Sequence, residues 1–455
     1  MIEPVLMSRL ARAVGRPLTG DDIAISGIAI DSRAVEPGDL FVAIPGQRVD
    51  GHDYVPAAVE RGAVAVLAQR ECESSGATTL QVADTIAALG ALGQLLRDDY
   101  EAVLVGITGS AGKTTAKKLL AAMLAEAGPT LATAGNLNNE IGVPLTLQRL
   151  TADTEFAVVE MGAGKPNDIR YLCEIARPTV SVLLNAGSAH LEAYPNPAAL
   201  ADTKGQILDA LNADDLAVIN ADQVWTEGWA TRSAPARCVT FGLADDATYR
   251  ATNIESRAFE GVSFDLVARH HSRRMTVRVP GMPGVYNTLA AVAVATELGL
   301  SDEAIDRGLA TVQPAAGRGR VHRTPGGAMI VDDSYNANPE AVKAAIDSLA
   351  QCEGRKILVF GDMLELGEDS AEFHRGVVQH AAAQGIDCLL TVGEEAAKAA
   401  PVFPGDAQQY PSNADLVAAE HRFAEGDVVL VKGSRSVGLD AAVAAWVGSR
   451  ENVAC

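Results

Sequence analysis

The stretch that decides the fold is residues 103–120, which read VLVGITGSAGKTTAKKLL. An apolar run, Val103–Thr108, is followed by a turn with Gly109 and Gly112 and then by a helical segment rich in alanine and leucine. This order predicts a buried strand, a phosphate-binding loop and a helix whose positive N-terminus faces an anion. Glycines let backbone amides approach phosphate, Lys113 would reach the β- and γ-phosphates, and a threonine hydroxyl would bind Mg²⁺.

The spacing of this loop departs slightly from the common GxxxxGK[ST] pattern. The first glycine of that pattern would fall at Ile107, and the chain has it at Gly106 instead. A phosphate loop by itself predicts only that a nucleotide binds. It would serve a kinase, a motor, a switch or a ligase equally well.

The composition indicates a folded, acidic chain of several domains. Its 455 residues predict about three domains. Hydrophobic residues make up 48% and charged residues 21%, which excludes a disordered chain. The net charge of −21 argues against a nucleic-acid partner, because neutralising phosphates requires lysine and arginine. Only 4% of the residues are aromatic, so stacking platforms for single strands are not expected.

The sequence gives no signal for a membrane segment or for export. The most apolar stretch, Leu289–Leu300, contains Glu297 and is shorter than the ~18–20 residues of a membrane helix. The first residues, MIEPVLMSRLARAVG, lack the apolar centre of a signal peptide and predict an amphipathic helix over residues 5–14. Six cysteines without a CxxC pair predict reduced thiols, no zinc site and a cytoplasmic location. They are Cys72, Cys173, Cys238, Cys352, Cys388 and Cys455.

Short β-branched runs alternate with alanine-rich helical stretches, which predicts an α/β fold with right-handed crossovers. Several runs are apolar throughout, as in parallel strands buried on both faces. Residues 253–280 alternate instead and predict a solvated antiparallel hairpin. The predicted parallel strands are Val103–Thr108, Phe156–Met161, Val180–Leu184, Leu216–Asn220, Lys356–Phe360, Cys388–Val392 and Val428–Lys432.

Two breaks divide the chain, one in the polar stretch Glu71–Thr79 and one in Val312–Gly327, which is rich in glycine, proline and arginine. We therefore expect domains at residues 1–83, 84–312 and 313–455. The first would be a small α/β domain, and the second a parallel-sheet domain that carries the phosphate loop. The third, with three strands separated by helices, would be a Rossmann-like α/β domain.

Three residues beyond the loop are candidates for the chemistry. Glu160 ends an apolar strand of the same sheet and could reach the Mg²⁺ of a bound nucleotide. His190 follows the next predicted strand, and Lys204 lies on a predicted helix. A structural histidine and a solvated lysine are the alternatives for the last two. Their order after a phosphate loop favours a functional role for both.

Together these motifs resemble the ATP-dependent Mur ligases of peptidoglycan precursor synthesis, over essentially the whole chain. The first part has DSRAVEPGDLFVAIPGQRVDGHDYVPAAVERGAVAVL, which is similar to the family's domain for the uridine-diphosphate sugar. The centre has GITGSAGKTT, the family's own form of the loop, with GNLNNEIGVPLTL, EMGAG and AHLEAY. The last part has DDSYNANP, GDMLELGE and VKGSRS. This last group implies the branch that joins D-alanyl-D-alanine to UDP-N-acetylmuramoyl-tripeptide through an acyl phosphate, releasing ADP and phosphate.

The resemblance implies a role for each matched residue. Lys113 would hold the ATP phosphates, Thr114 and Glu160 would bind one Mg²⁺, and His190 would serve a second. Lys204 matches the lysine that the family carbamylates with CO₂. Further ATP-binding positions would be Thr108, Gly109, Ser110, Ala111, Gly112, Thr115, Asn287 (at the adenine), Arg318 and Asp333. Substrate positions would be Asp31, Ser32 and Arg33 at the nucleotide sugar, Asn138 and Asn139 at the acyl acceptor, Asn336, and Lys432, Ser434 and Arg435 at the dipeptide. We also expect a monomer, although the sequence leaves the oligomeric state open.

Two departures from the family pattern are visible. Many relatives have a histidine–asparagine pair shortly before the adenine asparagine, where this chain has Pro283 and Gly284. Many relatives also continue after KGSR with glycine and a methionine–glutamate pair, where this chain has Ser436, Leu439 and Asp440.

Three other functions remain as alternatives. A Mur ligase that adds a single diamino acid would be expected to carry a DNPR-type string, which this sequence lacks. A folate polyglutamylating ligase would lack the first domain. A nucleotide switch or a non-catalytic relative would not need the carbamylated lysine at a second metal. The sequence leaves open whether the tripeptide ends in meso-diaminopimelate or lysine.

Overall fold

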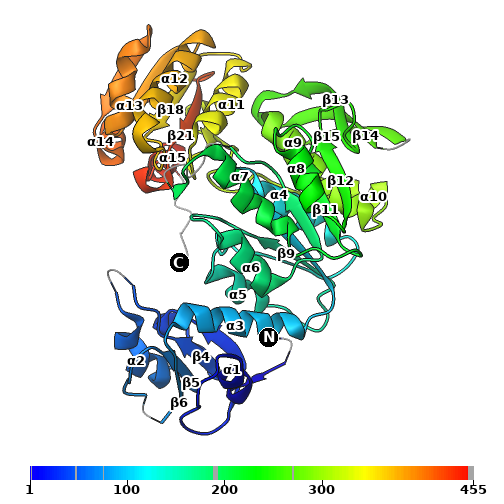
Figure 1. Ribbon diagram of the computed structural model, residues 1–455. Coiled ribbons are helices and arrows are strands. Elements are labelled where there is room, and N and C mark those ends of the chain that lie inside the picture. The colour runs from blue at the N-terminus through cyan, green and yellow to red at the C-terminus, as the bar shows by residue number, and fades with distance from the viewer. Residues whose placement is uncertain (2, 47–48, 75, 188–192, 269–270, 449–455) are drawn as a thin grey trace.

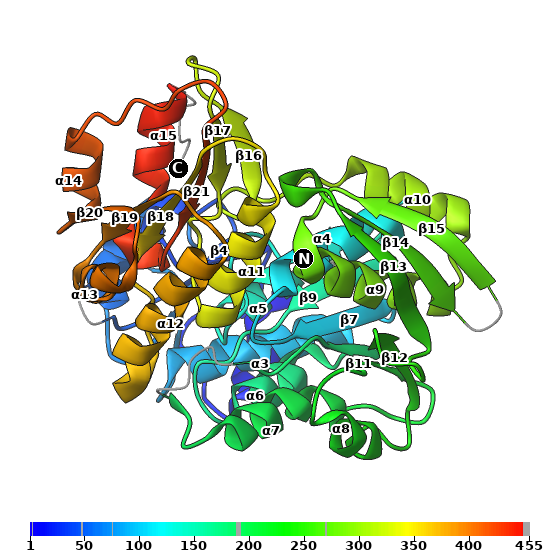
Figure 2. The same ribbon diagram turned by 90° about the horizontal axis from the view of Figure 1, so that it is seen from above.

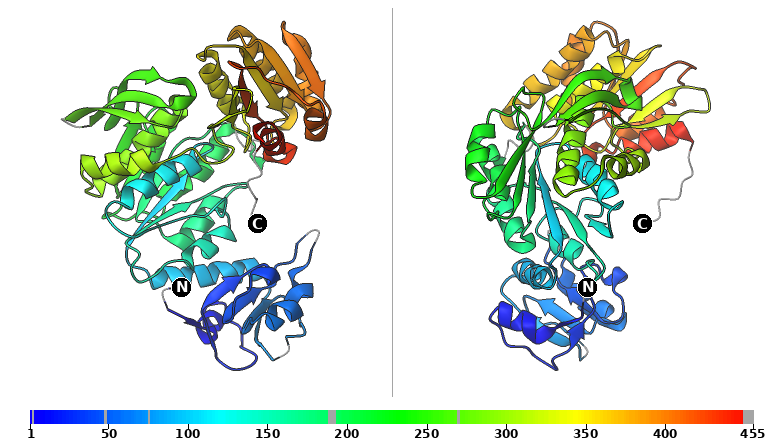
Figure 3. Two further views of the ribbon diagram at one scale, coloured as in Figure 1. Left: turned by 180° about the vertical axis from the view of Figure 1, so that it is seen from behind. Right: turned by 90° about the vertical axis from the view of Figure 1, so that its right-hand side faces the viewer.

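The computed structural model describes residues 1–455 except 2, 47–48, 75, 188–192, 269–270 and 449–455. Figure 1 shows an N-terminal, a central and a C-terminal part, each built around its own sheet. Both views in Figure 3 place the N- and C-terminal parts at opposite ends of the molecule. The three-domain α/β fold expected from the sequence is thereby confirmed.

The N-terminal part is a four-stranded parallel sheet in the order β3-β4-β5-β6. Its elements are β3 (Gly27–Ala29), β4 (Asp39–Val42), β5 (Ala65–Ala68), β6 (Thr78–Gln81), α1 (Met7–Ala13) and α2 (Val55–Glu60). The amphipathic helix expected over residues 5–14 is shorter than predicted. Val5 and Leu6 form a strand, β1 (Val5–Leu6), that pairs with β2 (Ala24–Ile25), and this long-range pairing delays the helix to Met7.

Helix α3 (Thr85–Asp98) joins the first two parts, and Figure 1 shows it lying along their junction. Asp84 caps it by accepting hydrogen bonds from the amides of Ile86 (2.8 Å) and Ala87 (3.0 Å). Leu89 and Leu92 are fully buried in one apolar core that extends from the first sheet into the central part. The domain limit expected at residue 83 falls just before this helix and stays a prediction.

The central part is a nine-stranded sheet in the order β15-β14-β13-β12-β11-β10-β7-β9-β8. The strands are β7 (Val103–Thr108), β8 (Thr130–Ala132), β9 (Phe156–Glu160), β10 (Val180–Leu183), β11 (Leu216–Asn220), β12 (Arg237–Gly242), β13 (Tyr249–Ser256), β14 (Val262–Ala268) and β15 (His271–Val277). Its helices are α4 (Lys113–Leu124), α5 (Gly142–Leu147), α6 (Asp168–Ala176), α7 (Pro197–Gly205), α8 (Thr226–Arg232), α9 (Gly281–Glu297) and α10 (Asp302–Thr311). All pairs from β8 to β13 are parallel, which the apolar runs predicted for β7, β9, β10 and β11. The strands β8 and β12 were not predicted.

The expectation of a solvated hairpin over residues 253–280 is wrong in one respect. The strands β13, β14 and β15 are antiparallel to one another, but they extend the central sheet. Phe264 is fully buried in the core that α9 also enters. The alternating pattern therefore reflects a sheet with one covered face.

The C-terminal part has a six-stranded sheet in the order β16-β17-β21-β18-β19-β20, which is parallel except for β16. The strands are β16 (Arg320–Arg323), β17 (Met329–Asp332), β18 (Lys356–Gly361), β19 (Cys388–Val392), β20 (Asp406–Tyr410) and β21 (Val428–Lys432). The helices are α11 (Pro339–Ala350), α12 (Ser370–Ala383), α13 (Glu394–Ala399), α14 (Asn413–Ala418) and α15 (Asp440–Val447). This arrangement agrees with the expected Rossmann-like domain.

Within the described ranges, no helix is long and apolar enough to cross a membrane. The cysteines that the structure describes are free thiols, as expected, and Cys455 lies outside them.

Candidate functional site

The phosphate loop connects β7 to α4 as the sequence predicted. Gly112 is the N-cap of α4 and has φ +86°, a left-handed conformation that favours glycine. A Cβ at this position would clash with the side-chain amide of Asn287 on α9, which is 5% exposed. Figure 2 shows α4 beside α9 in the middle of the molecule. The predicted adenine residue thus lies directly against the loop.

Asn185, which follows β10, holds the tip of the loop. Its Oδ1 accepts from the Ala111 amide (2.9 Å), its Nδ2 donates to the Ala111 carbonyl (3.1 Å), and its own carbonyl accepts from the Ser110 amide (3.1 Å). Sequence reasoning did not assign this residue. Its position at the end of a predicted strand, next to the strand that leads into the loop, could have indicated it.

The side chain of Lys113 contacts the loop itself, whereas the side chain of Thr108 contacts the residue after β9. The Lys113 Nζ donates to the Gly109 carbonyl (2.7 Å), so the side chain folds back along the loop. Burial lowers the pKa of Lys113, and the positive charge of the Arg318 guanidinium lowers it further. The negative charge of Glu160 acts in the opposite direction and raises this pKa, but by less than burial lowers it. The Thr108 hydroxyl is fully buried and donates to the Met161 carbonyl (2.9 Å), so this side chain faces β9.

Glu160, at the end of β9, is the centre of a buried polar cluster and is 2% exposed. Its carboxylate accepts from the Thr114 hydroxyl (3.1 Å) and from Nδ2 of Asn138 (2.9 Å). Lys117 Nζ lies 3.1 Å from its Oε2. Burial raises the pKa of Glu160, but the ammonium groups of Lys117 and Lys113 and the Asn138 hydrogen bond outweigh it, so the pKa lies below its ordinary value. The carboxylate is therefore ionised at neutral pH.

The oxygen atoms of Thr114 and Glu160 fit a hard divalent cation such as Mg²⁺, which prefers hydroxyl and carboxylate ligands. Across the described residues, no group of three or more histidine, cysteine, aspartate or glutamate side chains could hold a metal ion.

Lys204 lies on α7, as predicted, and is 1% exposed. Burial lowers its pKa well below the ordinary value, and repulsion from Lys113 lowers it further. A solvated lysine, the alternative considered from the sequence, is therefore wrong. The other candidate on this side, His190, lies outside the described residues.

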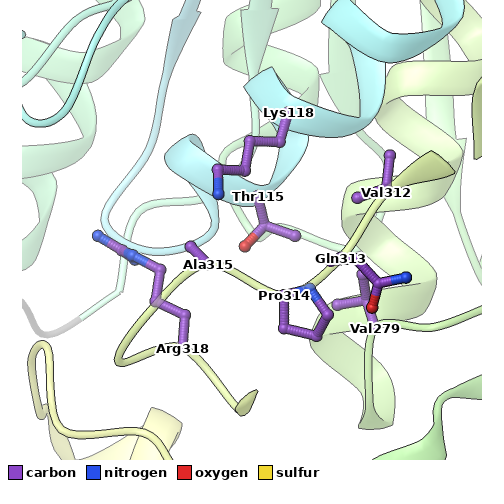
Figure 4. A pocket seen from close by; sticks show the side chains of 8 residues that line it. All are labelled: Thr115, Lys118, Val279, Val312, Gln313, Pro314, Ala315 and Arg318. Carbon is purple, nitrogen blue, oxygen red and sulfur yellow. The ribbon is translucent and has the colours of Figure 1, made fainter. Parts of the chain in front are cut away.

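A small pocket lies between the start of α4 and the segment that enters the C-terminal part (Figure 4). Thr115 and Lys118 line it from α4, and Arg318 lines it from the other side. The Arg318 guanidinium stacks over the Tyr335 ring, 4.1 Å from the ring centroid. Pro283 and Gly284, which depart from the family pattern, lie in the first turn of α9, where a Cβ at Gly284 would clash with the Val279 carbonyl.

Among the predicted residues of the C-terminal part, Lys432 bonds to Asp333 and to Asn336, whereas Ser434 and Arg435 have other partners. Lys432 Nζ bonds to Oδ2 of Asp333 (2.6 Å) and to the Asn336 carbonyl (3.0 Å), and Lys432 is 4% exposed. Burial raises the pKa of Asp333 although Lys432 and Arg318 oppose it. Arg435 is exposed, lies 5.8 Å from the Tyr335 ring centroid and pairs with Asp440 (2.9 Å). Ser434 accepts from the Leu364 amide (2.9 Å). The ammonium of Lys432 is thus already paired within its own domain.

The remaining predicted residues lie in the segment before α5 and in the N-terminal part. Asn139 Oδ1 accepts from the Gly142 amide (2.9 Å) and fixes the start of α5. Asp31 accepts from the backbone and guanidinium of Arg33, which lowers its pKa to about 2. Ser32 is buried, whereas the Arg33 side chain is exposed. These three residues lie in the part of the molecule farthest from the C-terminal sheet (Figure 1).

Three sequence models of one family match the chain. The Mur ligase family catalytic domain matches residues 24–100, the Mur ligase middle domain residues 107–295, and the Mur ligase glutamate ligase domain residues 317–435.

Individual proteins are similar over nearly the full length. UDP-N-acetylmuramoyl-tripeptide–D-alanyl-D-alanine ligase of Escherichia coli strain K12 is 36% identical over 99% of both chains. The crystal structure of MurF from Acinetobacter baumannii is 30% identical, has a TM-score of 0.89, and covers 98% of this chain and 100% of its own. The crystal structure of MurF from Thermotoga maritima in complex with ADP is 29% identical and has a TM-score of 0.82. It covers 93% of this chain and 97% of its own.

Proposed function

The chain belongs to the Mur ligase family, and on that premise we propose that it is the ligase that joins D-alanyl-D-alanine to UDP-N-acetylmuramoyl-tripeptide. ATP drives the reaction, and the products are UDP-N-acetylmuramoyl-pentapeptide, ADP and phosphate, in peptidoglycan precursor synthesis. The observation that carries the proposal is the phosphate loop with Thr114 against Glu160, in a chain that is similar to such ligases over its full length.

Amide formation from a carboxylate and an amine is unfavourable in water, so the acid must first be activated. The tripeptide carboxylate attacks the γ-phosphorus of ATP, the bond from this phosphorus to the β,γ-bridging oxygen breaks, and ADP leaves, which gives an acyl phosphate. The D-alanyl-D-alanine amine then attacks the acyl carbon, and phosphate leaves. Lys113, at the N-terminus of α4, stabilises the negative charge on the phosphoryl oxygens.

The chain's own residues also protect the intermediate. An acyl phosphate hydrolyses readily, so water must be kept from it. Arg318 borders the same pocket as Thr115 and would meet the nucleotide from the C-terminal side. Closure of that part over the centre would exclude water and complete the site.

For the metal site, we propose that Thr114 and Glu160 hold one Mg²⁺ and that His190 and Lys204 serve a second. Mg²⁺ would supply charge stabilisation at the phosphoryl group. The buried Lys204 amine, whose pKa is low, is neutral more often than an ordinary lysine. A neutral amine is the form that reacts with CO₂, which supports carbamylation at this residue.

The rival functions have less support. The relatives named above carry the D-alanyl-D-alanine ligase name at up to 36% identity, whereas a ligase for 2,6-diaminopimelate is 17% identical and is similar in fold alone. A switch would not need a carbamylated lysine at a second metal, the role proposed for the buried Lys204. We further propose a monomer, and a cytoplasmic location, where ATP and UDP-activated sugars are made.

The test is phosphate release from ATP with each UDP-tripeptide, ending in meso-diaminopimelate or lysine, with and without D-alanyl-D-alanine. We expect release that depends on the dipeptide. Lys113→Ala should abolish it with little change in the unfolding temperature, and Lys398→Ala, at an exposed lysine of α13, is the matched control. Nucleotide binding without dipeptide-dependent release would favour the switch. Normal turnover by folded Lys113→Ala would contradict the role of the loop.

A further inference from the structure

Lys117 is a buried cation for which neither the sequence nor the proposed function has a role. It lies four residues after Lys113 on α4, so both side chains leave the same face of the helix. Its Nζ lies 3.1 Å from Glu160 Oε2 and 3.4 Å from the Gly135 carbonyl. The side chains of Lys117 and Glu160 are 4% and 3% exposed. The pair is therefore shielded from water.

The carboxylate of Glu160 is already occupied by donors of the chain. The single Thr114 hydroxyl lies within hydrogen-bond distance of both oxygens, Asn138 donates to Oε1 (2.9 Å), and Lys117 faces Oε2. A divalent cation that binds this carboxylate must share or replace these contacts. Of these partners, only Lys117 carries a full positive charge, so it repels the incoming cation directly.

The Gly135 carbonyl gives the ammonium a second acceptor. It belongs to the loop before α5, which also supplies Asn138 and whose Thr133 hydroxyl accepts from the Glu160 amide (2.9 Å). If the carboxylate turned to a metal ion, Lys117 could stay hydrogen-bonded to Gly135. A buried ammonium without any acceptor would be far less favourable.

We infer that Lys117 is a resident counter-ion of Glu160, which neutralises and positions the carboxylate in the metal-free protein and competes with the divalent cation for it. This inference rests on the proposed function, because it takes Glu160 as the Mg²⁺ ligand. Lys117 is thus a positioning residue that sets how much Mg²⁺ the nucleotide site requires. Removing its charge weakens the metal-free protein and strengthens metal binding.

The experiment measures the unfolding temperature of the whole chain with ADP while MgCl₂ is titrated, without acyl substrate. Lys117→Met keeps most of the side-chain volume and removes the charge. We expect a lower unfolding temperature without metal and a Mg²⁺ half-saturation concentration about tenfold lower than in the original protein. Lys398→Met removes an exposed lysine that pairs with Glu394 (2.8 Å) and should change neither value appreciably.

Two further measurements keep the test decisive. Lys117→Gln keeps a hydrogen-bond donor without the charge, so it should lower the Mg²⁺ requirement even if Lys117→Met does not fold. Mn²⁺ binding in the presence of ADP, followed by electron paramagnetic resonance, should show the same order of affinities. An unchanged or higher half-saturation concentration in the folded variants would overturn the inference and leave an ordinary structural ion pair. Because no acyl substrate is used, failure of dipeptide-dependent phosphate release would instead overturn the proposed function alone.

Discussion

Gly112→Ala tests whether the contact between the phosphate loop and α9 builds the nucleotide site. Two independent effects act at this position. The backbone has φ +86°, which disfavours alanine, and the new Cβ would clash with the Asn287 amide oxygen and lie 3.0 Å from its Cγ. Asn287 is buried on α9 and has little room to rotate away.

The two effects differ in size and in consequence. The left-handed backbone costs about 1–2 kcal/mol for a residue with a Cβ. Displacing Asn287 from its rotamer adds about 1 kcal/mol. If the loop moves instead, the phosphate loses one charge-assisted hydrogen bond of about 2 kcal/mol, or about 30-fold in affinity. We expect a clear loss of stability together with an ADP affinity that falls at least about tenfold.

Gly299→Ala is the matched control at the other end of α9. Gly299 has φ +89°, and a Cβ there would meet nothing within 4 Å. It should therefore lower the unfolding temperature through the backbone effect alone and leave ADP affinity unchanged. Isothermal titration with ADP and thermal unfolding measure the two quantities. The variant Gly112→Ala/Asn287→Ala removes the clash, so its loss of stability should be smaller than the sum of the single losses by about 1 kcal/mol. Equal effects of Gly112→Ala and Gly299→Ala on both quantities would refute the reasoning.

Lys204→Ala should lose dipeptide-dependent phosphate release, and acetate or formate should restore part of this activity by replacing the carbamate. Full activity without added carboxylate would show that Lys204 is a structural lysine. Arg97→Met should lower the free energy of unfolding by about 2–3 kcal/mol, measured by thermal unfolding. The reason is that it removes hydrogen bonds to the carbonyls of Ala176 (2.8 Å) and Arg177 (3.1 Å) at the junction of α3 and α6. A change below about 0.5 kcal/mol would contradict this. Burial lowers the pKa of His421, which bonds to Tyr410 (2.8 Å), so the unfolded chain binds more protons and stability falls as the pH drops through 6.5. His421→Phe should weaken that dependence, and identical pH profiles of the two unfolding temperatures would refute it.

Much of the fold was readable because its strands are local features. The runs predicted for β7, β11, β19 and β21 have the same first and last residues as the observed strands, since strands buried on both faces contain few polar positions. The start of the chain was predicted less well. Whether Val5 and Leu6 continue the helix depends on pairing with Ala24 and Ile25, and local periodicity carries no information about such a partner.

The candidate site was likewise predicted in part from the sequence. Lys113, Thr114 and Glu160 were found because a loop motif and a strand end are short sequence signals. Lys117 and Asn185 were not, because their contacts join segments far apart in the chain. Their roles, like those of the other candidate residues, stay predictions until the variants are measured.

The sequence by itself determined the α/β architecture, the phosphate loop and the family, because each follows from residue order over short stretches. Only the tertiary structure decided which charges lie together, Glu160 with Lys117 and Asp333 with Lys432. It also decided that Lys204 is buried, at 1% exposure. The physical reason is that the charge state of a side chain depends on its neighbours and on its access to water. Both arise only when distant segments pack.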